Sequence, residues 1–202
     1  MANFHNLDIK NIVRETSDSV VISFEVPKAL IKKYTYSAGQ YTSLKLNIDG
    51  IEVIRDYSIC SHVDEDLSIG VKKLENGLMS SFLNSSVKIG DSVKVSEPRG
   101  RFTIRDNFNS IIAIAAGSGI TPIMSMLKQI LFNTDKNFYL IYSNKSVETT
   151  MFLSQINELK DRFQSRFFVK LVFTSTKIAS HQFGRITAVS YTHLTLPTTP
   201  YV

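Results

Sequence analysis

The spacing of apolar residues changes its period between residues 103 and 110, and this change divides the chain of 202 residues into two parts. Before it, short runs of alternating polar and apolar residues are separated by turn pairs such as Asp49-Gly50. Alternation is typical of strands with one buried face, and several short strands in succession predict an antiparallel sandwich or barrel. The expected strands are Val20 to Val26, Tyr41 to Ile48, Val53 to Cys60, Leu67 to Leu74 and Ser92 to Ser96, with one or two helical turns after Gly77.

Beyond residue 110, apolar strands alternate with helices. Ile111 to Ala116 is continuously apolar, as is typical of a strand covered on both faces. Further strands are expected at Phe138 to Tyr142 and Phe167 to Phe173. Their order with the helices predicts a parallel sheet with right-handed crossovers. The apolar faces of the two expected helices are formed by Ile123, Leu127, Ile130 and Leu131, and by Phe152, Ile156, Leu159 and Phe163.

The composition is that of a globular protein, with 43% hydrophobic and 20% charged residues. The net charge is +5, but the basic residues are spread along the chain, so nucleic-acid binding is not indicated. The N-terminus has no apolar core that could serve as a signal peptide, and no apolar run approaches the roughly 18 residues of a membrane span. We therefore expect a cytoplasmic protein that does not bind membranes.

A metal centre is not expected within this chain. The single cysteine, Cys60, excludes an internal disulfide and a four-cysteine zinc or iron–sulfur site. The histidines are separated along the chain and show no ligand spacing, which favours surface or loop positions over metal binding. They are His5, His62, His181 and His193.

The segment Ser190 to Val202 fits neither pattern. It has two prolines, no charged residue and no helical period. It resembles the translated sequencing-adapter tails that contaminate open reading frames, so we expect it to be non-native and the native chain to stop near Ala188 or Val189. A genuine flexible tail is the alternative. The expected division of the chain is 1–105, 106–189 and the tail 190–202.

Two glycine turns precede predicted helices. In the second part, Gly117 and Gly119 follow the first parallel strand, with Thr121 expected as the N-cap and Pro122 as the first helical residue. A helix N-terminus at the carboxyl edge of a parallel sheet attracts phosphate. The third glycine of the dinucleotide fingerprint is absent, however, and a plain tight turn has a similar composition.

The segment Gly77-Leu78-Met79-Ser80-Ser81 repeats this arrangement in the first part, with a glycine turn before a hydroxyl at an expected helix start. Exposed N–H groups together with Ser80 can hold a phosphate. A simple capping role for Ser80 is the alternative that this segment favours when it is taken alone.

The stretch RDYSICS places Arg55, Tyr57 and Ser58 within one expected strand. Arg55 and Tyr57 share a face because side chains alternate along a strand. A guanidinium group suits a pair of phosphates, and a phenol ring can stack on a flat heterocycle. Ser58 can add a hydrogen bond at the rim of that heterocycle. Taken alone, the motif favours a salt-bridged surface arginine beside a half-buried tyrosine.

The order of four segments changes this interpretation. RDYSICS, GVKKLENGLMSSFL, IGDSVKVSEPRGRF and IIAIAAGSGITPIMSMLKQIL together resemble the ferredoxin–NADP reductase superfamily from about Leu7 to Ala188. YSNKSVETTMFLSQINELKDRF and FGRIT resemble the reductase components of bacterial multicomponent oxygenases, especially the phenylacetyl-CoA epoxidase reductase type. The resemblance implies a six-stranded antiparallel Greek-key β-barrel that binds FAD (1–105). A Rossmann-like parallel-sheet α/β domain that binds NAD(P) follows (106–189) and is incomplete.

The resemblance also implies roles by matching position. Arg55 binds the FAD pyrophosphate, Tyr57 stacks on the isoalloxazine, and Ser58 forms a hydrogen bond near flavin N5, so Tyr57 and Ser58 lie closest to the chemistry. The adenosine and phosphate part of FAD is assigned to Val71, Lys72, Gly77, Met79 and Ser80. The pyridine nucleotide is assigned to Gly117, Gly119, Thr121 and Pro122, with Tyr142, Ser143, Asn144 and Lys145 where the adenosine ribose is recognised. A contact of Lys145 with a 2′-phosphate favours NADPH over NADH.

The implied reaction is hydride transfer from NAD(P)H to FAD, followed by one-electron transfer to an iron–sulfur acceptor on a redox partner. Family members continue into a cysteine-glycine-proline segment, and this subfamily adds a four-cysteine [2Fe–2S] domain; neither is present in these residues. We therefore expect a truncated chain that binds FAD, carries no [2Fe–2S] cluster and transfers hydride poorly. Two alternatives are a flavin-binding electron carrier or regulatory subunit without turnover, and a basic nucleic-acid-binding barrel.

Overall fold

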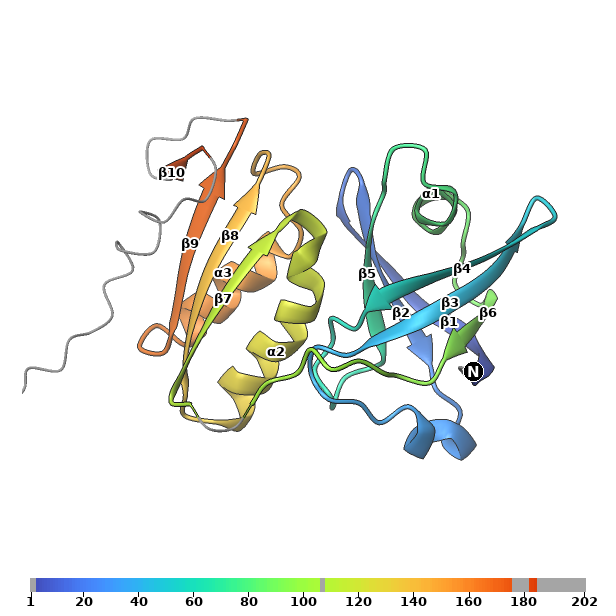
Figure 1. Cartoon of the computed structure of the whole chain (residues 1–202), viewed down its shortest axis with the longest axis horizontal. Coiled ribbons are helices and arrows are strands. Elements are labelled where there is room, and N and C mark those ends of the chain that lie inside the picture. Colours follow the sequence, from blue (N-terminus) through green and yellow to red (C-terminus); the bar gives the residue numbers. More distant parts are fainter. Residues whose placement is uncertain (1–2, 106–107, 176–181, 185–202) are drawn as a thin grey trace, which may run out of the picture.

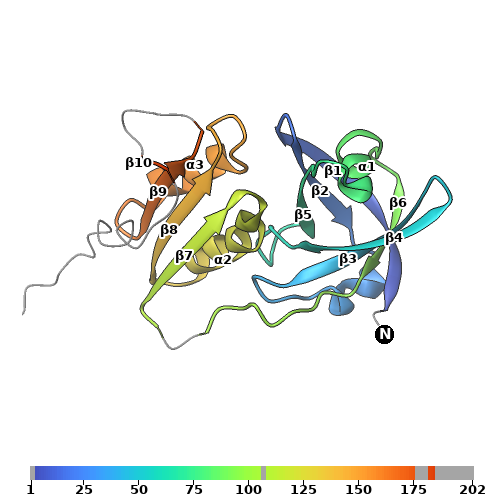
Figure 2. The same ribbon diagram turned by 45° about the horizontal axis from the view of Figure 1, so that its top comes forward.

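The computed structural model describes residues 3–105, 108–175 and 182–184. Figure 1 shows two bodies side by side: strands β1 to β6 with helix α1, and strands β7 to β10 with helices α2 and α3. Helix α2 lies on the side of the second sheet that faces the first body, as the turned view of Figure 2 also shows. The tail predicted at 190–202 lies outside the described residues, as do His181 and His193.

The first body is a curled antiparallel sheet with the strand order β4-β3-β6-β1-β2-β5. Its edge strands meet where Ile59 forms a bridge with Ile69, and where the Cys60 N–H donates to the Ser68 carbonyl at 2.9 Å. The predicted six-stranded antiparallel fold is confirmed, as a half-closed barrel. The strands are β1 (Phe4–Thr16), β2 (Ser19–Glu25), β3 (Tyr41–Ile48), β4 (Ile51–Ser58), β5 (Ser68–Lys72) and β6 (Ser92–Ser96).

Strand β1 is the element that apolar alternation in the sequence does not reveal. Only Leu7 and Ile9 of its residues are buried, and register shifts interrupt its pairing with β2 after Ile9 and after Arg14. A bulge adds one residue to a strand, so the two-residue period is lost. Polar and charged residues fill most of its other positions, which hides the strand in the sequence.

Two short helical elements complete the first body. A 3₁₀ helix η1 (Lys28–Lys33) precedes Tyr34, whose hydroxyl donates to the Val95 carbonyl at 2.8 Å inside the barrel. Helix α1 (Leu78–Ser85) lies after β5, where one or two helical turns were expected. Asn84 at its end donates to the Val71 carbonyl at 3.3 Å, which ties the helix to β5.

The second body is a parallel sheet with the order β10-β9-β8-β7. Strand, helix and strand alternate as predicted, and the parallel α/β fold is confirmed. No helix among the described residues is both long and apolar enough to cross a membrane. The elements are β7 (Ser110–Ala116), a 3₁₀ turn η2 (Gly117–Gly119), α2 (Ile120–Asn133), β8 (Asn137–Asn144), α3 (Leu153–Arg162), β9 (Phe167–Phe173) and β10 (Gln182–Phe183).

Both helices of the second body cover the same face of its sheet. Consecutive strands lie in order, so right-handed crossovers place α2 and α3 on one side. Ala113, Leu140 and Tyr142 lie on that face and share one apolar core with the two helices. On the opposite face, Ile112 and Ile114 are 55% and 47% exposed. Among the described residues, the expectation that this strand is covered on both faces is therefore wrong.

Helix α2 also packs against the barrel. Ser125 Oγ donates to the Ser61 carbonyl at 2.7 Å, and His62 Nε2 lies 2.8 Å from Asn133 Oδ1 at the end of the helix. His62 is buried between the two bodies. It lies in a loop, as one of the two expected positions allows, but it is not at the surface, because a hydrogen-bonded imidazole can be buried at an interface.

Gly70 lies where β5 approaches the start of α2. A Cβ atom at this position would lie 2.5 Å from Thr121 Cγ2, and 3.2 Å from both Met151 Cε and Phe152 Cζ. A side chain therefore does not fit without displacing its neighbours, and the glycine allows the two bodies to pack closely.

We expect Gly70→Ala to lower the free energy of unfolding by about 1–3 kcal/mol, because overpacking forces neighbouring side chains apart. Urea denaturation measures this loss. Gly119→Ala is the matched control, since Gly119 has an ordinary φ of −60° and no atom lies within 4 Å of an added Cβ. A Gly70→Ala protein as stable as wild type contradicts the close packing.

Candidate functional site

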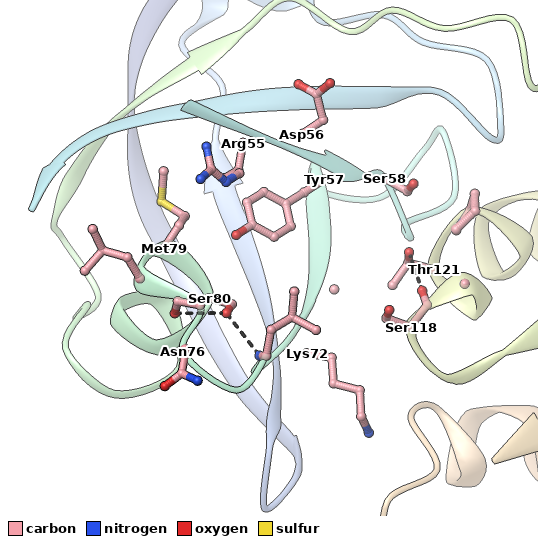
Figure 3. Close-up of a pocket in the computed structure, with 16 residues that line it drawn as sticks. Arg55, Asp56, Tyr57, Ser58, Lys72, Asn76, Met79, Ser80, Ser118 and Thr121 are labelled. Atoms are coloured by element: carbon pink, nitrogen blue, oxygen red, sulfur yellow. Dashed lines mark hydrogen bonds between the residues drawn. The ribbon is translucent and has the colours of Figure 1, made fainter. Parts of the chain in front are cut away.

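A cleft of about 500 Å³ opens where the barrel meets the N-terminal end of α2 (Figure 3). Its walls come from β4, β5, the start of α1 and the start of α2, so both bodies contribute. The predicted site residues that line it are Arg55, Tyr57, Ser58, Lys72, Gly77, Met79, Ser80, Gly119, Thr121 and Pro122. Lining residues that were not predicted are Asp56, Gly70, Leu74, Asn76, Leu78 and Ser118.

Arg55 is an exposed cation at this cleft. Its Nη1 donates to the carbonyl of the neighbouring Ile54 at 2.7 Å, and it forms no ion pair with any residue that the structure describes. The motif alone favoured a salt-bridged arginine, but Arg55 forms no such salt bridge with the described residues. A guanidinium group without a carboxylate partner is suited to bind an anion such as a phosphate pair.

Tyr57 lies beside Arg55 on the same strand, with its ring in the cleft, as the alternation predicts (Figure 3). Burial raises the pKa of Tyr57 to about 12, although the charge of Arg55 acts in the opposite direction. The phenol is therefore neutral at ordinary pH. Ser58 follows at the end of β4, paired with Tyr41 of β3. Together, Tyr57 and Ser58 offer a flat surface and a hydroxyl group to a heteroaromatic ring.

Asp56 points away from the Tyr57 ring (Figure 3) and is hydrogen-bonded by the Ser43 hydroxyl. Arg99 lies 3.5 Å from the same carboxylate and donates to the hydroxyls of Ser43 and Ser96. This network ties β3 and β4 to the segment after β6. The two arginines therefore differ: Arg99 is held by hydrogen bonds on the face of the sheet away from the cleft, whereas Arg55 is available to a ligand.

The turn before α1 forms a second wall of the cleft. Helix α1 begins after Gly77. The backbone N–H groups of its first turn have no intrahelical partners, and the N-cap residue has no side chain that could accept from them. Ser80 Oγ accepts from the Leu74 N–H at 3.1 Å and donates to the Gly77 carbonyl at 3.2 Å. Ser80 therefore closes the turn instead of capping the helix, and Met79 beside it is buried.

Helix α2 begins earlier than predicted. Thr121 was expected as the N-cap and Pro122 as the first helical residue, but the helix begins at Ile120 with Gly119 as its N-cap. Thr121 Oγ1 donates back to the Ser118 carbonyl at 3.0 Å. The threonine hydroxyl thus stabilises the turn, and Pro122 occupies a later position in the first helical turn.

Gly117 and Gly119 leave room above this turn. Gly117 has a φ of +51°, a region that favours glycine, and an added Cβ at either position would meet no atom within 4 Å. Tyr142 supports the turn from the core: it is fully buried, and its hydroxyl donates to the Gly117 carbonyl at 3.1 Å. Tyr142 therefore lies under the turn and outside the lining of the cleft.

Val71 and Lys72 are adjacent in β5 but lie differently relative to the cleft. Val71 is completely buried in the barrel core and does not line the cleft. Lys72 borders the cleft, but its Nζ donates to Asp18 Oδ1 at 3.1 Å and to the Thr149 carbonyl at 2.8 Å. Figure 3 shows its side chain running away from the Tyr57 ring. The amino group thus links the barrel to the second body.

Ser143, Asn144 and Lys145 lie at the end of β8, outside the lining of the cleft. Ser143 is half-buried and Lys145 is exposed. Asn144 is buried, and its Nδ2 lacks a well-formed hydrogen bond to any residue that the structure describes. A buried amide without a well-formed hydrogen bond has capacity left to bind a polar ligand.

Some lining residues carried a signal that sequence reasoning did not use. Asn76, with a φ of +58°, belongs to an Asn-Gly turn, and Ser118 lies between two glycines. If every residue of each glycine turn is counted as a candidate, both residues are found. Leu74 and Leu78 are exposed leucines, and nothing in their spacing distinguishes them from core residues.

The described residues contain no group of three histidine, cysteine, aspartate or glutamate side chains placed to hold a metal ion. Cys60 is buried, and burial raises the pKa of its thiol to about 12. The thiol therefore stays protonated and takes no part in the cleft. The chemistry of the cleft depends on a cation, an aromatic ring and backbone N–H groups.

Comparisons with known proteins match both bodies. A family described as an oxidoreductase FAD-binding domain matches residues 6–104, and one described as an oxidoreductase NAD-binding domain matches residues 113–194. One of the subunits of the 1,2-phenylacetyl-CoA epoxidase of Escherichia coli is 34% identical over 185 residues, which are 89% of this chain and 52% of that protein.

A second relative is the ferredoxin reductase component of the 3-ketosteroid-9-alpha-monooxygenase of Rhodococcus rhodochrous. It is 31% identical over 166 residues, which are 81% of this chain and 47% of that protein. The chain thus spans about half the length of these curated relatives.

A solved structure shows the same fold. The flavohaemoglobin-like FAD/NAD-binding domain of the nitric oxide dioxygenase from Vibrio cholerae has a TM-score of 0.82 at 22% identity, over 98% of this chain and 84% of that one. The family matches follow the order of the two bodies along the chain. The chain therefore belongs to the ferredoxin–NADP reductase superfamily, as an oxidoreductase FAD-binding domain followed by an oxidoreductase NAD-binding domain.

Proposed function

We propose that this chain binds FAD in the cleft and moves electrons from NAD(P)H through the flavin to an iron–sulfur acceptor on a redox partner. One observation carries the proposal. Arg55 and Tyr57 line the same cleft as two turns that begin helices, one from each body. A ligand with a pyrophosphate and a flat ring satisfies this set. When bound, FAD supplies the conversion of a two-electron hydride into single electrons.

Different barrel residues bind different parts of FAD. Arg55 and the N–H groups at the start of α1 bind the pyrophosphate, and Tyr57 stacks on the isoalloxazine. Ser58 donates a hydrogen bond near flavin N5 and, with Tyr57, lies closest to the reacting atoms. Gly77, Met79 and Ser80, with Lys72 and the backbone of Val71, border the adenosine and phosphate part.

The second body receives the pyridine nucleotide. The turn at Gly117 and Gly119, with Thr121 and Pro122 behind it, leaves open space on the side of the cleft. Asn144 and Lys145 bind the adenosine end, since Asn144 has a buried amide without a well-formed partner and Lys145 has an exposed cation. Lys145 beside a 2′-phosphate makes NADPH the preferred donor.

The names of the relatives support a separate electron acceptor. One belongs to an epoxidase of several subunits, and another is the ferredoxin reductase component of a monooxygenase. We infer that the acceptor is the iron–sulfur cluster of a ferredoxin-type domain or an oxygenase component, and that residues 1–105 and 106–189 are the FAD and NAD(P) units. The expected compartment is the cytoplasm.

Arg55→Ala tests the flavin site. Loss of the guanidinium group should weaken FAD affinity at least about tenfold, since one charge-assisted phosphate pair contributes about 1.5–3 kcal/mol. The free energy of unfolding should change by less than about 0.5 kcal/mol, because Arg55 is exposed and its side-chain hydrogen bond among the described residues is to the neighbouring Ile54. Fluorescence titration with FAD and urea denaturation measure the two effects.

Arg99→Ala is the matched control for this substitution. It breaks the network with Ser43, Ser96 and Asp56, so it should cost about 1–3 kcal/mol of stability and leave FAD affinity within about twofold of wild type. If Arg55→Ala loses FAD affinity and stability equally, Arg55 has a purely structural role.

Lys145→Ala tests the choice of nucleotide. In the FAD-loaded protein under anaerobic conditions, we expect NADPH to bleach the flavin at lower concentration than NADH. Removing Lys145 should cut the NADPH advantage about tenfold, because the cation beside the 2′-phosphate is lost. Lys160→Ala, on α3, is the control and should keep the wild-type preference. Failure of both nucleotides to bleach the flavin would favour an electron carrier without turnover.

A further inference from the structure

The β8–α3 loop (residues 145–152) follows Asn144 and begins with Lys145, the two residues proposed to bind the adenosine end of the nucleotide. It is partly held by its own contacts. The hydroxyls of Thr149 and Thr150 donate to the Ser146 carbonyl at 3.2 and 2.7 Å, and the Thr150 N–H donates to the Val147 carbonyl at 3.0 Å. These contacts shape the loop but do not attach it to the barrel.

Glu15, at the end of β1 in the barrel, makes such an attachment. Its Oε2 accepts from the Phe152 N–H at 3.0 Å, and its Oε1 accepts from Gln155 Nε2 at 3.3 Å. Lys72 adds a second link from β5 through the Thr149 carbonyl at 2.8 Å. A carboxylate and an ammonium group from different barrel strands thus hold successive parts of one loop.

The bond to Glu15 replaces a cap that α3 does not provide for itself. Phe152 is the N-cap of α3 and forms no side-chain cap. At many helix starts the third helical residue reaches back to the N–H of the N-cap, and Gln155 occupies that position here. Gln155 instead donates to Glu15, and the glutamate accepts the N–H. A negative charge is favoured at this end of a helix.

Phe152 also depends on its surroundings for its backbone shape. Its φ is +60°, and its side chain is buried. A bulky residue in the left-handed region is strained and persists only where neighbouring contacts hold it. Glu15 binds the N–H of this strained residue, so the carboxylate acts where the loop is least able to hold its own shape.

The residue before Glu15 contacts helix α1, whose first residues line the cleft. Arg14 Nη2 and Nη1 donate to the carbonyl and the side chain of Asn84, at 2.5 and 3.2 Å, at the end of α1. The end of β1 therefore holds both α1, which borders the proposed flavin phosphate site, and α3, which follows the proposed nucleotide site.

We propose that Glu15 is a positioning residue for nucleotide binding: it fixes the β8–α3 loop, and through it Asn144 and Lys145, relative to the flavin-binding barrel. The inference rests on the proposed function, because it assigns the loop to the nucleotide. Glu15 itself touches neither cofactor. Its loss lowers the fraction of molecules with a binding-competent loop, and the apparent nucleotide affinity falls by the same factor.

The test compares wild type with Glu15→Ala, Glu15→Gln and the control Glu65→Gln. Glu65 also joins the barrel to the second body, through Lys128 Nζ at 2.8 Å, but Lys128 lies on α2 away from the loop. Calorimetric titration measures NADP⁺ and NAD⁺ affinity, fluorescence titration measures FAD affinity, and hydrogen exchange measures protection of the Phe152 amide. None of these measurements requires turnover.

For Glu15→Ala we expect NADP⁺ affinity to fall at least fivefold and exchange of the Phe152 amide to rise about tenfold, with FAD affinity within about twofold of wild type. Glu15→Gln keeps an acceptor oxygen and should recover part of both losses, and Glu65→Gln should match wild type. Unchanged NADP⁺ affinity in Glu15→Ala overturns the proposal, as does an equal loss of FAD affinity, which indicates a general structural role. If wild type itself binds no dinucleotide, the proposed function fails, and this inference with it.

Discussion

The close approach of helix α2 to strand β5 at Gly70 determines where the cleft forms. With no side chain at Gly70, Thr121 and Phe152 pack directly against the barrel strand. The turn that begins α2 therefore lies opposite the turn that begins α1, and β4 runs between them. Helix starts concentrate unpaired N–H groups. Two helix starts at one cleft offer more N–H donors to a phosphate group than either body offers alone.

The charges around the cleft favour the same kind of ligand. Arg55 has no carboxylate partner among the described residues, whereas the nearby Arg99 is fully engaged on the other face of the sheet. Tyr57 is kept neutral by burial and presents its ring next to the free cation. A ligand that is anionic at one point and flat and aromatic at another matches this arrangement, which is why we propose FAD, and not a simple anion, as the ligand of the cleft.

Periodicity in the sequence predicted most of the fold, because buried faces leave a regular pattern. Strand β1 was missed, since bulges interrupt its alternation. Arg55, Tyr57 and Ser58 line the cleft together, and the sequence grouped them because they lie in one short strand. Two contacts of predicted site residues were not foreseen: the Tyr142 hydroxyl supports the glycine turn from the core, and the Lys72 amino group links the two bodies. Such roles depend on contacts between distant segments, which a local pattern does not contain.

The most direct measurement of flavin binding in the cleft is a titration of the purified chain with FAD, followed by flavin fluorescence. We expect saturation at one FAD per chain, quenching of the flavin by the Tyr57 ring, and competition by ADP, which shares the adenosine and pyrophosphate. Tyr57→Leu should retain binding through Arg55 and lose much of the quenching. No saturable binding of FAD, or binding that ADP does not weaken, would contradict the assignment of the cleft.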